Sequence, residues 1–264
     1  MANVCYCADD FALNSSISNA IIDLIQKNRL HATSCMTQSP EWPNAAQQLK
    51  PYTFQAEVGL HLNFTHVFDS NTWAFSLPQL MFKAWSRQLS RQKVYESIQA
   101  QWQAFTQALG QTPDFVDGHQ HVHQFPIIRE VLIQFLQEQN FKGWIRNLQH
   151  AVVVAPYQFK TNMLMQLGSK SLRRLCTQSH FKQNQNFAGI YDFKPMNYAS
   201  LNQKWLAQAQ DHLLIMCHPA QNSTDQDDAI KVARVQEYQY LDSSQFIYDC
   251  QANQITLTRI GVSA

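Results

Sequence analysis

The stretch VCYCADD (residues 4–10) is a short apolar run that ends in two adjacent carboxylates. The residues after it, 15–28, space their apolar side chains as a helix does, and Asn14 or Ser15 can cap that helix. A short apolar run followed by a helical stretch recurs about seven times, which is the pattern of a parallel α/β fold. The expected strands are residues 4–10, 31–37, 57–64, 114–121, 143–147, 188–193 and 213–218, and the expected helices lie near 15–28, 43–50, 90–109, 127–139, 157–178, 200–211 and 227–239.

Length and composition favour one domain, residues 1–264, because a chain of 264 residues with 45% hydrophobic side chains can bury a full-sized core. The 20 Lys and Arg residues against 19 Asp and Glu, without a long basic run, argue against a nucleic acid or an anionic membrane and favour a small neutral ligand. Six cysteines without a CxxC pair, and a first segment unlike a signal peptide, predict a cytoplasmic protein with reduced thiols. No apolar stretch approaches the roughly 20 residues that cross a bilayer.

Nearly every expected strand ends, on its C-terminal side, in a group that can ligate a metal, transfer a proton or bind a substrate. In a parallel barrel these strand ends open on one face, where active sites of such folds are assembled. Polar loops alone explain a Thr or an Asn at such a place, but they explain the repeated histidines less well. The groups are Asp9 and Asp10, Thr37, His61 and Asn63, Asp117 and His119, Arg146, Asp192 and His218.

Asp9 and Asp10 are adjacent carboxylates, and their repulsion at the mouth of an apolar strand requires a cation or a shared proton. A divalent metal ion would supply that compensation. One carboxylate can then bind the ion while its neighbour acts as a general base. The alternative is that one of them only caps the following helix.

Histidines supply the other candidate ligands. His61 lies in the apolar run GLHLNF, where its ring needs a partner, either a metal ion or a backbone group. In VDGHQHVHQFP (116–126), an extended backbone places His119 and His121 on one face, but one ion with three protein ligands needs only some of these rings. We expect His119 to be a ligand, and His121 and His123 to orient ligands or the loop through their ring N–H groups.

His218, after the run LLIMC, is a natural general acid for a leaving amine, although a hydrogen-bonded core histidine is the alternative. Arg146 and Asp192 complete the ring of polar groups, either in the reaction or as a structural ion pair. Residues 65–89 are expected to be an irregular insertion on the active face. Within it, Trp73 and Trp85 either stack on a substrate ring or anchor the loop.

Four segments, CADDFALNSSISNAI, GLHLNFT, VDGHQHVHQFP and IMCHPA, resemble in sequence and order the signature segments of the YdjC-like carbohydrate deacetylases. That family includes chito-oligosaccharide deacetylases and a hopanoid-associated branch, and its pattern reads approximately NADDFG, GLHL, DSHQHVH and HPG. The resemblance spans residues 4–220. It implies a distorted (β/α) barrel of about seven parallel strands, related to polysaccharide deacetylases.

The resemblance also implies roles for individual residues. Asp10, His61 and His119 would hold one divalent ion, Mg²⁺ or Zn²⁺, with Asp9 as the catalytic base and His218 as the acid. The expected reaction removes an N-acetyl group from an amino sugar, with a chito-oligosaccharide or a glycolipid as substrate. This chain departs from the pattern at Cys7, Ala12, Gly118 and Ala220, and none of these departures removes a proposed ligand.

Two rival functions fit the same residues: a phosphoesterase on a similar barrel, which would hold two or three ions, and a sugar-binding protein that has lost its chemistry. Two imidazoles and a carboxylate also accept Mn²⁺ or Co²⁺. The oligomeric state stays open, with a homodimer as one alternative, because apolar surface cannot be mapped from sequence.

Overall fold

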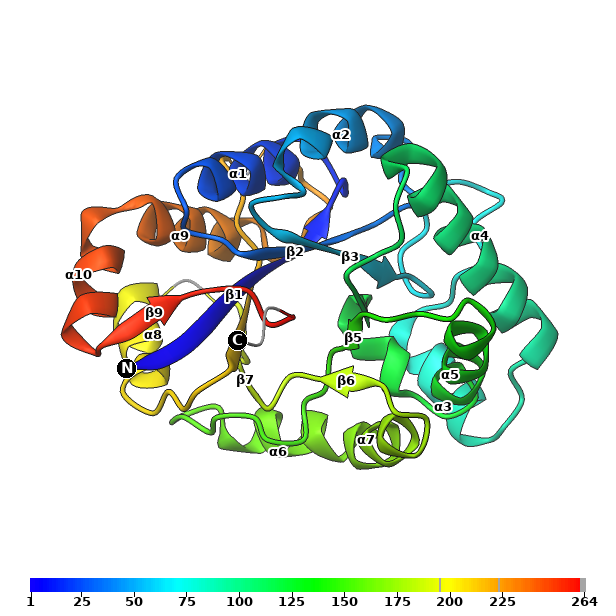
Figure 1. Ribbon diagram of the computed structural model, residues 1–264. Coiled ribbons are helices and arrows are strands. Elements are labelled where there is room, and N and C mark those ends of the chain that lie inside the picture. The colour runs from blue at the N-terminus through cyan, green and yellow to red at the C-terminus, as the bar shows by residue number, and fades with distance from the viewer. Residues whose placement is uncertain (195, 223, 262–264) are drawn as a thin grey trace.

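The computed structural model describes residues 1–194, 196–222 and 224–261. Its nine strands form one sheet in which every pair is parallel, in the order β6-β5-β4-β3-β2-β1-β8-β7, with β9 also paired to β1. The sheet curls into a barrel inside a ring of helices (Figure 1). The strands are β1 (Ala2–Phe11), β2 (Ala32–Cys35), β3 (Glu57–Leu62), β4 (Phe115–Gly118), β5 (Trp144–Ile145), β6 (Lys182–Gln183), β7 (Asn186–Ala188), β8 (Leu213–Cys217) and β9 (Ile255–Leu257).

The helices cover the outside of the sheet, and their ends follow local sequence signals. Asn14 accepts a hydrogen bond from the backbone N–H of Ile17 and caps α1, while Gly110 ends α4 in the left-handed conformation. The α-helices are α1 (Ser15–Gln26), α2 (Trp42–Leu49), α3 (Leu77–Trp85), α4 (Arg91–Leu109), α5 (Ile128–Glu138), α6 (Gln158–Gln166), α7 (Ser169–Gln178), α8 (Tyr198–Leu206), α9 (Lys231–Asp242) and α10 (Ser244–Ala252), with short 3₁₀ turns at Lys50–Tyr52 and His119–Gln124. Within the described residues, none of these helices combines the length and the apolarity that a membrane span needs.

The expected parallel α/β barrel is confirmed, with nine strands in place of about seven. The sheet is only partly closed. β6 and β7 lie at the two ends of the strand order and do not pair with each other in the described chain. An isolated parallel bridge joins Ala151 to Phe187 of β7. The strands absent from the sequence expectation, β6 and β9, have two and three residues, too few to show an alternating pattern.

Several expectations for individual segments are wrong. The expected strand 188–193 is strand only at its first residue, because Gly189 (φ 102°) and Phe193 (φ 59°) take left-handed conformations. The expected helix 157–178 is two helices separated at Gly168, where φ is 111° and a Cβ would lie 2.2 Å from the carbonyl oxygen of Gln124. The segment 65–89 is not irregular throughout, since it contains α3, and α10 has no counterpart in the expected helices.

The barrel interior is filled by side chains that alternate with those facing the helices. Along β1, Val4, Tyr6 and Ala8 pack toward the helices, whereas Cys5 and Cys7 belong to the inner cluster. In that inner cluster the rings of Phe115 and Trp144 stack at 4.2 Å between centroids and 9° between planes. Gly59 on β3 makes this possible, because a Cβ there would lie 2.4 Å from the Phe115 ring.

Gly59→Ala should therefore lower the free energy of unfolding by about 1–3 kcal/mol, the usual cost of overpacking a core. Adding Phe115→Leu should recover part of that loss, because the smaller side chain makes room for the new methyl group. Urea unfolding of the two single variants and the double variant measures both effects. Strictly additive losses would show that the two side chains do not compete for the same space.

Candidate active site

Both adjacent aspartates reach the same site although neighbours in a regular strand point to opposite faces. Asp9 follows the inward alternation of Cys5 and Cys7. After Ala8 the register with β2 shifts, and Asp10 takes φ 66°, a left-handed conformation rare for Asp. The local irregularity turns the Asp10 carboxylate toward the same cavity, which is the geometry that a strand pattern alone would not predict.

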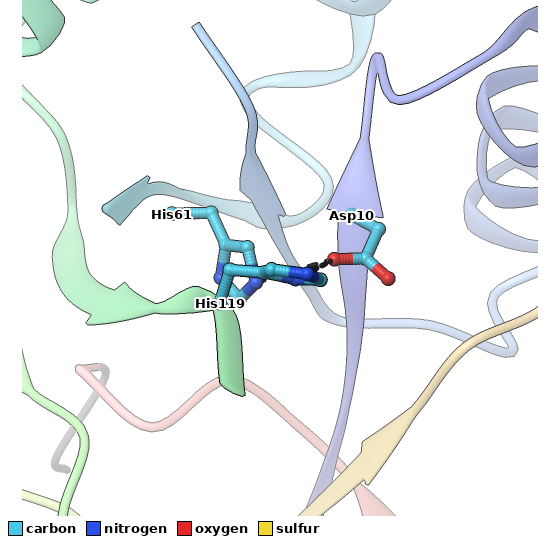
Figure 2. Close-up of side chains that lie close together, drawn as sticks. All are labelled: Asp10, His61 and His119. Atoms are coloured by element: carbon cyan, nitrogen blue, oxygen red, sulfur yellow. Dashed lines mark hydrogen bonds and ion pairs between the residues drawn. The ribbon is translucent and has the colours of Figure 1, made fainter. Parts of the chain in front are cut away.

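Asp10 meets two histidines at the C-terminal ends of β3 and β4 (Figure 2). Its Oδ1 lies 2.9 Å from Nδ1 of His119 and 3.3 Å from Nε2 of His61. One ligand atom from each residue lies within 4.8 Å of the others. Asp10 and His61 are buried, and His119 is partly exposed on the cavity side.

Two of these three residues, His61 and Asp10, are held in place by partners behind the ligand atoms. Nδ1 of His61 lies 2.7 Å from Oδ1 of Asp117, so its N–H donates to that carboxylate and leaves Nε2 free to bind a cation. Oδ2 of Asp10 accepts a hydrogen bond of 2.7 Å from Arg234. A carboxylate behind a ligating histidine is typical of metal sites, and ligand atoms in a tetrahedral zinc site lie roughly 3.3 Å apart. The three residues therefore fit one divalent ion.

Charges around His61 change its proton affinity. Burial opposes protonation of the ring, but the charge of Asp117 and the hydrogen bonds to Asp10 and Asp117 outweigh it and raise the pKa of His61 to about 10. Burial likewise opposes ionisation of Asp10, whereas His119 and Arg234 hold the pKa of that carboxyl well below its usual range. Without an ion, His61 carries a proton that compensates the surrounding carboxylates.

Asp9 is held by Arg146, which follows β5. The guanidinium donates two hydrogen bonds of 2.6 Å, one to each carboxylate oxygen of Asp9, and also lies 2.8 Å from Oδ2 of Asp117. Its NH2 group lies 3.0 Å from Sγ of Cys7. Cys7, Asp9 and Asp117 could by spacing hold a second ion, but Arg146 contacts all three and supplies the positive charge there.

His218 lies at the end of β8, with Nε2 3.9 Å from Oδ2 of Asp9. Burial lowers the pKa of His218 to about 4, against the opposing charges of Asp9 and Asp10, so the ring is neutral near pH 7 in the folded protein. Its Nδ1 is buried and has no hydrogen-bond partner in the part of the chain that the structure describes. The nitrogen that faces Asp9 is thus the one available for proton transfer.

These groups line one cavity of about 680 Å³. Asp9, Asp10, His61, His119 and His218 belong to its polar lining. The segment after β3 supplies one wall, so the expected insertion 65–89 does border the site. Apolar wall residues are Val67, Phe68, Leu77, Leu164, Ile190 and Met216.

The two tryptophans of that segment do not line the cavity. Trp73 packs against Phe64 and Phe75, and Trp85 packs edge-on against Phe125. The structure therefore favours the loop-anchoring alternative over stacking on a substrate.

The histidine triplet does not lie on an extended backbone, which corrects the expected strand 114–121. β4 ends at Gly118, and Gln120 and His121 are left-handed in the turn that follows. His121 is buried, lines the cavity and packs edge-on against Phe187. His123 points elsewhere, and its Nε2–H donates to the carbonyl oxygen of Arg146.

Four expected site residues lie outside the cavity lining: Arg146 and His123, described above, and Asn63 and Asp192. Asn63 organises the loop after β3, where its Oδ1 accepts from the backbone N–H groups of Thr65 and His66. Asp192 accepts from the backbone N–H of Lys194 and is exposed at the surface. The expectation for Asp192 assumed that it ends a strand, and that strand does not extend so far.

Sequence reasoning missed Arg234 and the specific role of Asp117. Arg234 lies on α9, pairs with Asp10 and Asp228, and is buried. Its only sequence signal is its place within the expected helix 227–239, which does not distinguish a buried arginine from a solvated one. Asp117 was recognisable as a strand-end group, but its pairing with His61 depends on the register of β3 against β4, where the two residues are direct partners.

Comparisons with known proteins identify relatives of this chain. A family model described as YdjC-like protein matches residues 3–252. The chitooligosaccharide deacetylase of Serratia marcescens is 27% identical over 143 residues, 50% of this chain and 54% of that protein, so the chain spans about half the length of the curated relatives it matches. The chain belongs to the YdjC-like family.

Two solved structures share the fold. A protein from Enterococcus faecalis V583 described as a candidate cellobiose-phosphate cleavage protein has a TM-score of 0.72 at 17% identity, covering 98% of this chain and 97% of that one. The Bc1960 peptidoglycan N-acetylglucosamine deacetylase has a TM-score of 0.53 at 11% identity, covering 98% of this chain and 86% of that one. The expected relation of the barrel to the polysaccharide deacetylases is confirmed at the level of the fold.

Uptake of a divalent ion should release about one proton near pH 7.5, because the ion displaces the proton that His61, with a pKa of about 10, carries without it. The apparent affinity should accordingly rise with pH, by up to about tenfold per unit below pH 10. Calorimetric titration of the metal-free protein with Zn²⁺ in buffers of different ionisation enthalpy counts the released protons. Binding without proton release would contradict a protonated His61.

Asp117→Asn should weaken metal binding by about 10–100-fold, because the amide no longer holds the His61 ring with a negative charge. Ser34→Ala is the matched control, since Oγ of Ser34 lies 2.9 Å from the same ring nitrogen but carries no charge. Competition with a chromophoric chelator measures both affinities. An equal loss in the two variants would mean that the charge of Asp117 has no particular effect.

Proposed function

We propose that this protein is a metal-dependent carbohydrate deacetylase that removes an N-acetyl group from an amino sugar. The observation that carries the proposal is the convergence of Asp10, His61 and His119 on one point beside the carboxylate of Asp9 and the ring of His218. The names of the relatives, chitooligosaccharide deacetylase among them, support the same reaction.

Asp10, His61 and His119 would hold the ion. Two imidazoles and one carboxylate favour Zn²⁺ over Mg²⁺, which prefers oxygen ligands in an octahedral arrangement. When bound, the ion supplies Lewis-acid chemistry, which polarises the acetamide carbonyl and lowers the pKa of a water molecule.

The remaining steps are proton transfers by the chain's own residues. Asp9, fixed by Arg146, accepts a proton from the attacking water as the new carbon–oxygen bond forms. Asp9 and His218 lie 3.9 Å apart, so this proton can pass to the ring of His218 as negative charge builds on the tetrahedral oxygen. His218 then gives the proton to the departing nitrogen while the carbon–nitrogen bond breaks, and acetate and a free amine leave.

The residues that line the cavity suit a substrate that is partly apolar. Ile190 and Met216 line the same cavity as the proposed metal ligands and supply apolar surface for the acetyl methyl group. His121 also lines the cavity and supplies a polar ring among these apolar residues. Both substrates considered from the sequence, a chito-oligosaccharide and an N-acetylglucosamine-containing glycolipid, present this combination of groups.

The number of cation sites favours this reaction over phosphate ester hydrolysis. Among the residues that the structure describes, two clusters have spacing suited to an ion, and Arg146 contacts all three members of the second. A phosphoesterase of similar architecture would use two or three ions. One ion per chain, measured by elemental analysis of the metal-loaded protein, is expected.

Asp9→Asn should leave metal binding intact and lower turnover by about 10²-fold or more, the scale of general acid–base catalysis. The assay is acetate release from N-acetylated sugars with Zn²⁺ or Mg²⁺ added back. Asp242→Asn, which alters a surface carboxylate paired with Lys27, is the control and should keep full activity. Full-speed turnover by Asp9→Asn would remove Asp9 from the role of base, and metal-loaded protein that binds sugar without releasing acetate would favour the sugar-binding alternative.

A further inference from the structure

The segment that follows β7 brings an aromatic ring onto His218. Phe193 is half-buried, its backbone is left-handed, and its ring meets the imidazole of His218 edge-on, with 5.0 Å between centroids and 88° between planes. A left-handed Phe costs conformational free energy, and such conformations persist where surrounding contacts fix them. The position of this ring is therefore determined by its neighbours.

Those neighbours hold Phe193 from two sides. The ring of Tyr191 lies 4.5 Å away, and the hydroxyl of Tyr191 donates to Glu237. Nζ of Lys160, on α6, lies 4.9 Å above the centroid of Phe193 and also donates to the carbonyl oxygen of Tyr191. A cation over an aromatic face is attracted to it, so Lys160 fixes both the backbone and the ring of this segment.

Within the described chain, in contrast, no hydrogen bond orients the ring of His218, whose Nε2 lies 3.9 Å from Oδ2 of Asp9. Its Nδ1 is buried without a hydrogen bond in the described chain, and Glu237 accepts from the backbone N–H of His218 and not from its ring. A catalytic histidine usually has a carboxylate or carbonyl on the second nitrogen to fix its orientation. In this protein, packing must fix the orientation of the His218 ring, and Phe193 packs edge-on against that ring.

We propose that Phe193 is a positioning residue, which holds the imidazole of His218 so that Nε2 faces Asp9 and the scissile nitrogen. The inference rests on the proposed function, in which His218 protonates that nitrogen. Without the ring, the imidazole can rotate and the proton donor loses its alignment, while Asp10, His61 and His119 stay in place. Phe193 also lines the cavity, so its loss changes one part of the wall as well.

The dependence on the leaving group tests this role. An N-acetyl amino sugar needs a proton on its nitrogen before the amine can leave, whereas the phenolate of 4-nitrophenyl acetate leaves without one. Phe193→Leu should therefore lower kcat for the amide by about tenfold or more, within the range of general acid catalysis, with a smaller change in KM because Phe193 also lines the cavity. Hydrolysis of 4-nitrophenyl acetate by the same metal-loaded variant should fall by less than about twofold.

Two controls separate positioning from packing. Phe193→Tyr keeps the aromatic edge and should retain the amide activity within about threefold, and Phe159→Leu, which alters an exposed ring elsewhere on α6, should affect neither substrate. If Phe193→Leu does not fold, Lys160→Met removes the cation above the ring and should give the same selective loss to a smaller degree. Equal losses for amide and ester, or a change confined to KM, would overturn the proposal.

A readout without turnover keeps this inference apart from the proposed function. Crystal structures of the metal-loaded protein and of Phe193→Leu should show one ring orientation for His218 in the first and a rotated or multiple orientation in the second. If the wild-type protein releases no acetate, the proposed function fails while this comparison still decides the role of Phe193. An unchanged His218 ring in Phe193→Leu would overturn the positioning role whatever the activity.

Discussion

The site depends on the pairing of buried charges. Three carboxylates, Asp9, Asp10 and Asp117, are almost completely buried, and ions in such a place are stable only when paired and hydrogen-bonded. Arg146 pairs with two of them and Arg234 with the third. Arg234 also pairs with Asp228, so two arginines face four carboxylates, and a protonated His61 offsets part of the negative charge that remains. Exchange of that proton for a divalent ion follows from this charge balance, and it explains why ligands and arginines form one network.

The barrel supplies the geometry that this network needs. Parallel strands end at one edge, so polar residues at the ends of β1, β3, β4 and β8 line the same cavity, and Arg146 after β5 pairs with Asp9 behind it. The irregularity at Asp10 lets one strand contribute two carboxylates with different partners, one on a fixed arginine and one on the histidines. Adjacent residues of the same type thereby acquire different chemical roles, since their surroundings and not their identity distinguish them.

Much of this arrangement could be predicted from the sequence. The repeated strand and helix pattern gave the parallel barrel, and the strand-end positions of Asp10, His61 and His119 placed them near one another. The partners behind them could not be predicted in the same way. Arg234 contacts Asp10 from a helix more than two hundred residues later in the chain. Asp192 lies outside the site because left-handed residues end the expected strand early. Pairings set by tertiary contacts and backbone turns leave no periodic signal in the chain.

The first strand of the barrel occupies the centre of its sheet. β1 pairs with β2, which follows it closely, but also with β8 and β9, which begin at Leu213 and Ile255. During synthesis on the ribosome, one edge of β1 must therefore stay unsatisfied until most of the polypeptide has been made. An apolar strand with open hydrogen-bonding groups is a hazard for aggregation, and contacts this distant in sequence slow folding. In a nascent chain of this topology, the open edge of β1 is available for wrong pairings until β8 and β9 emerge.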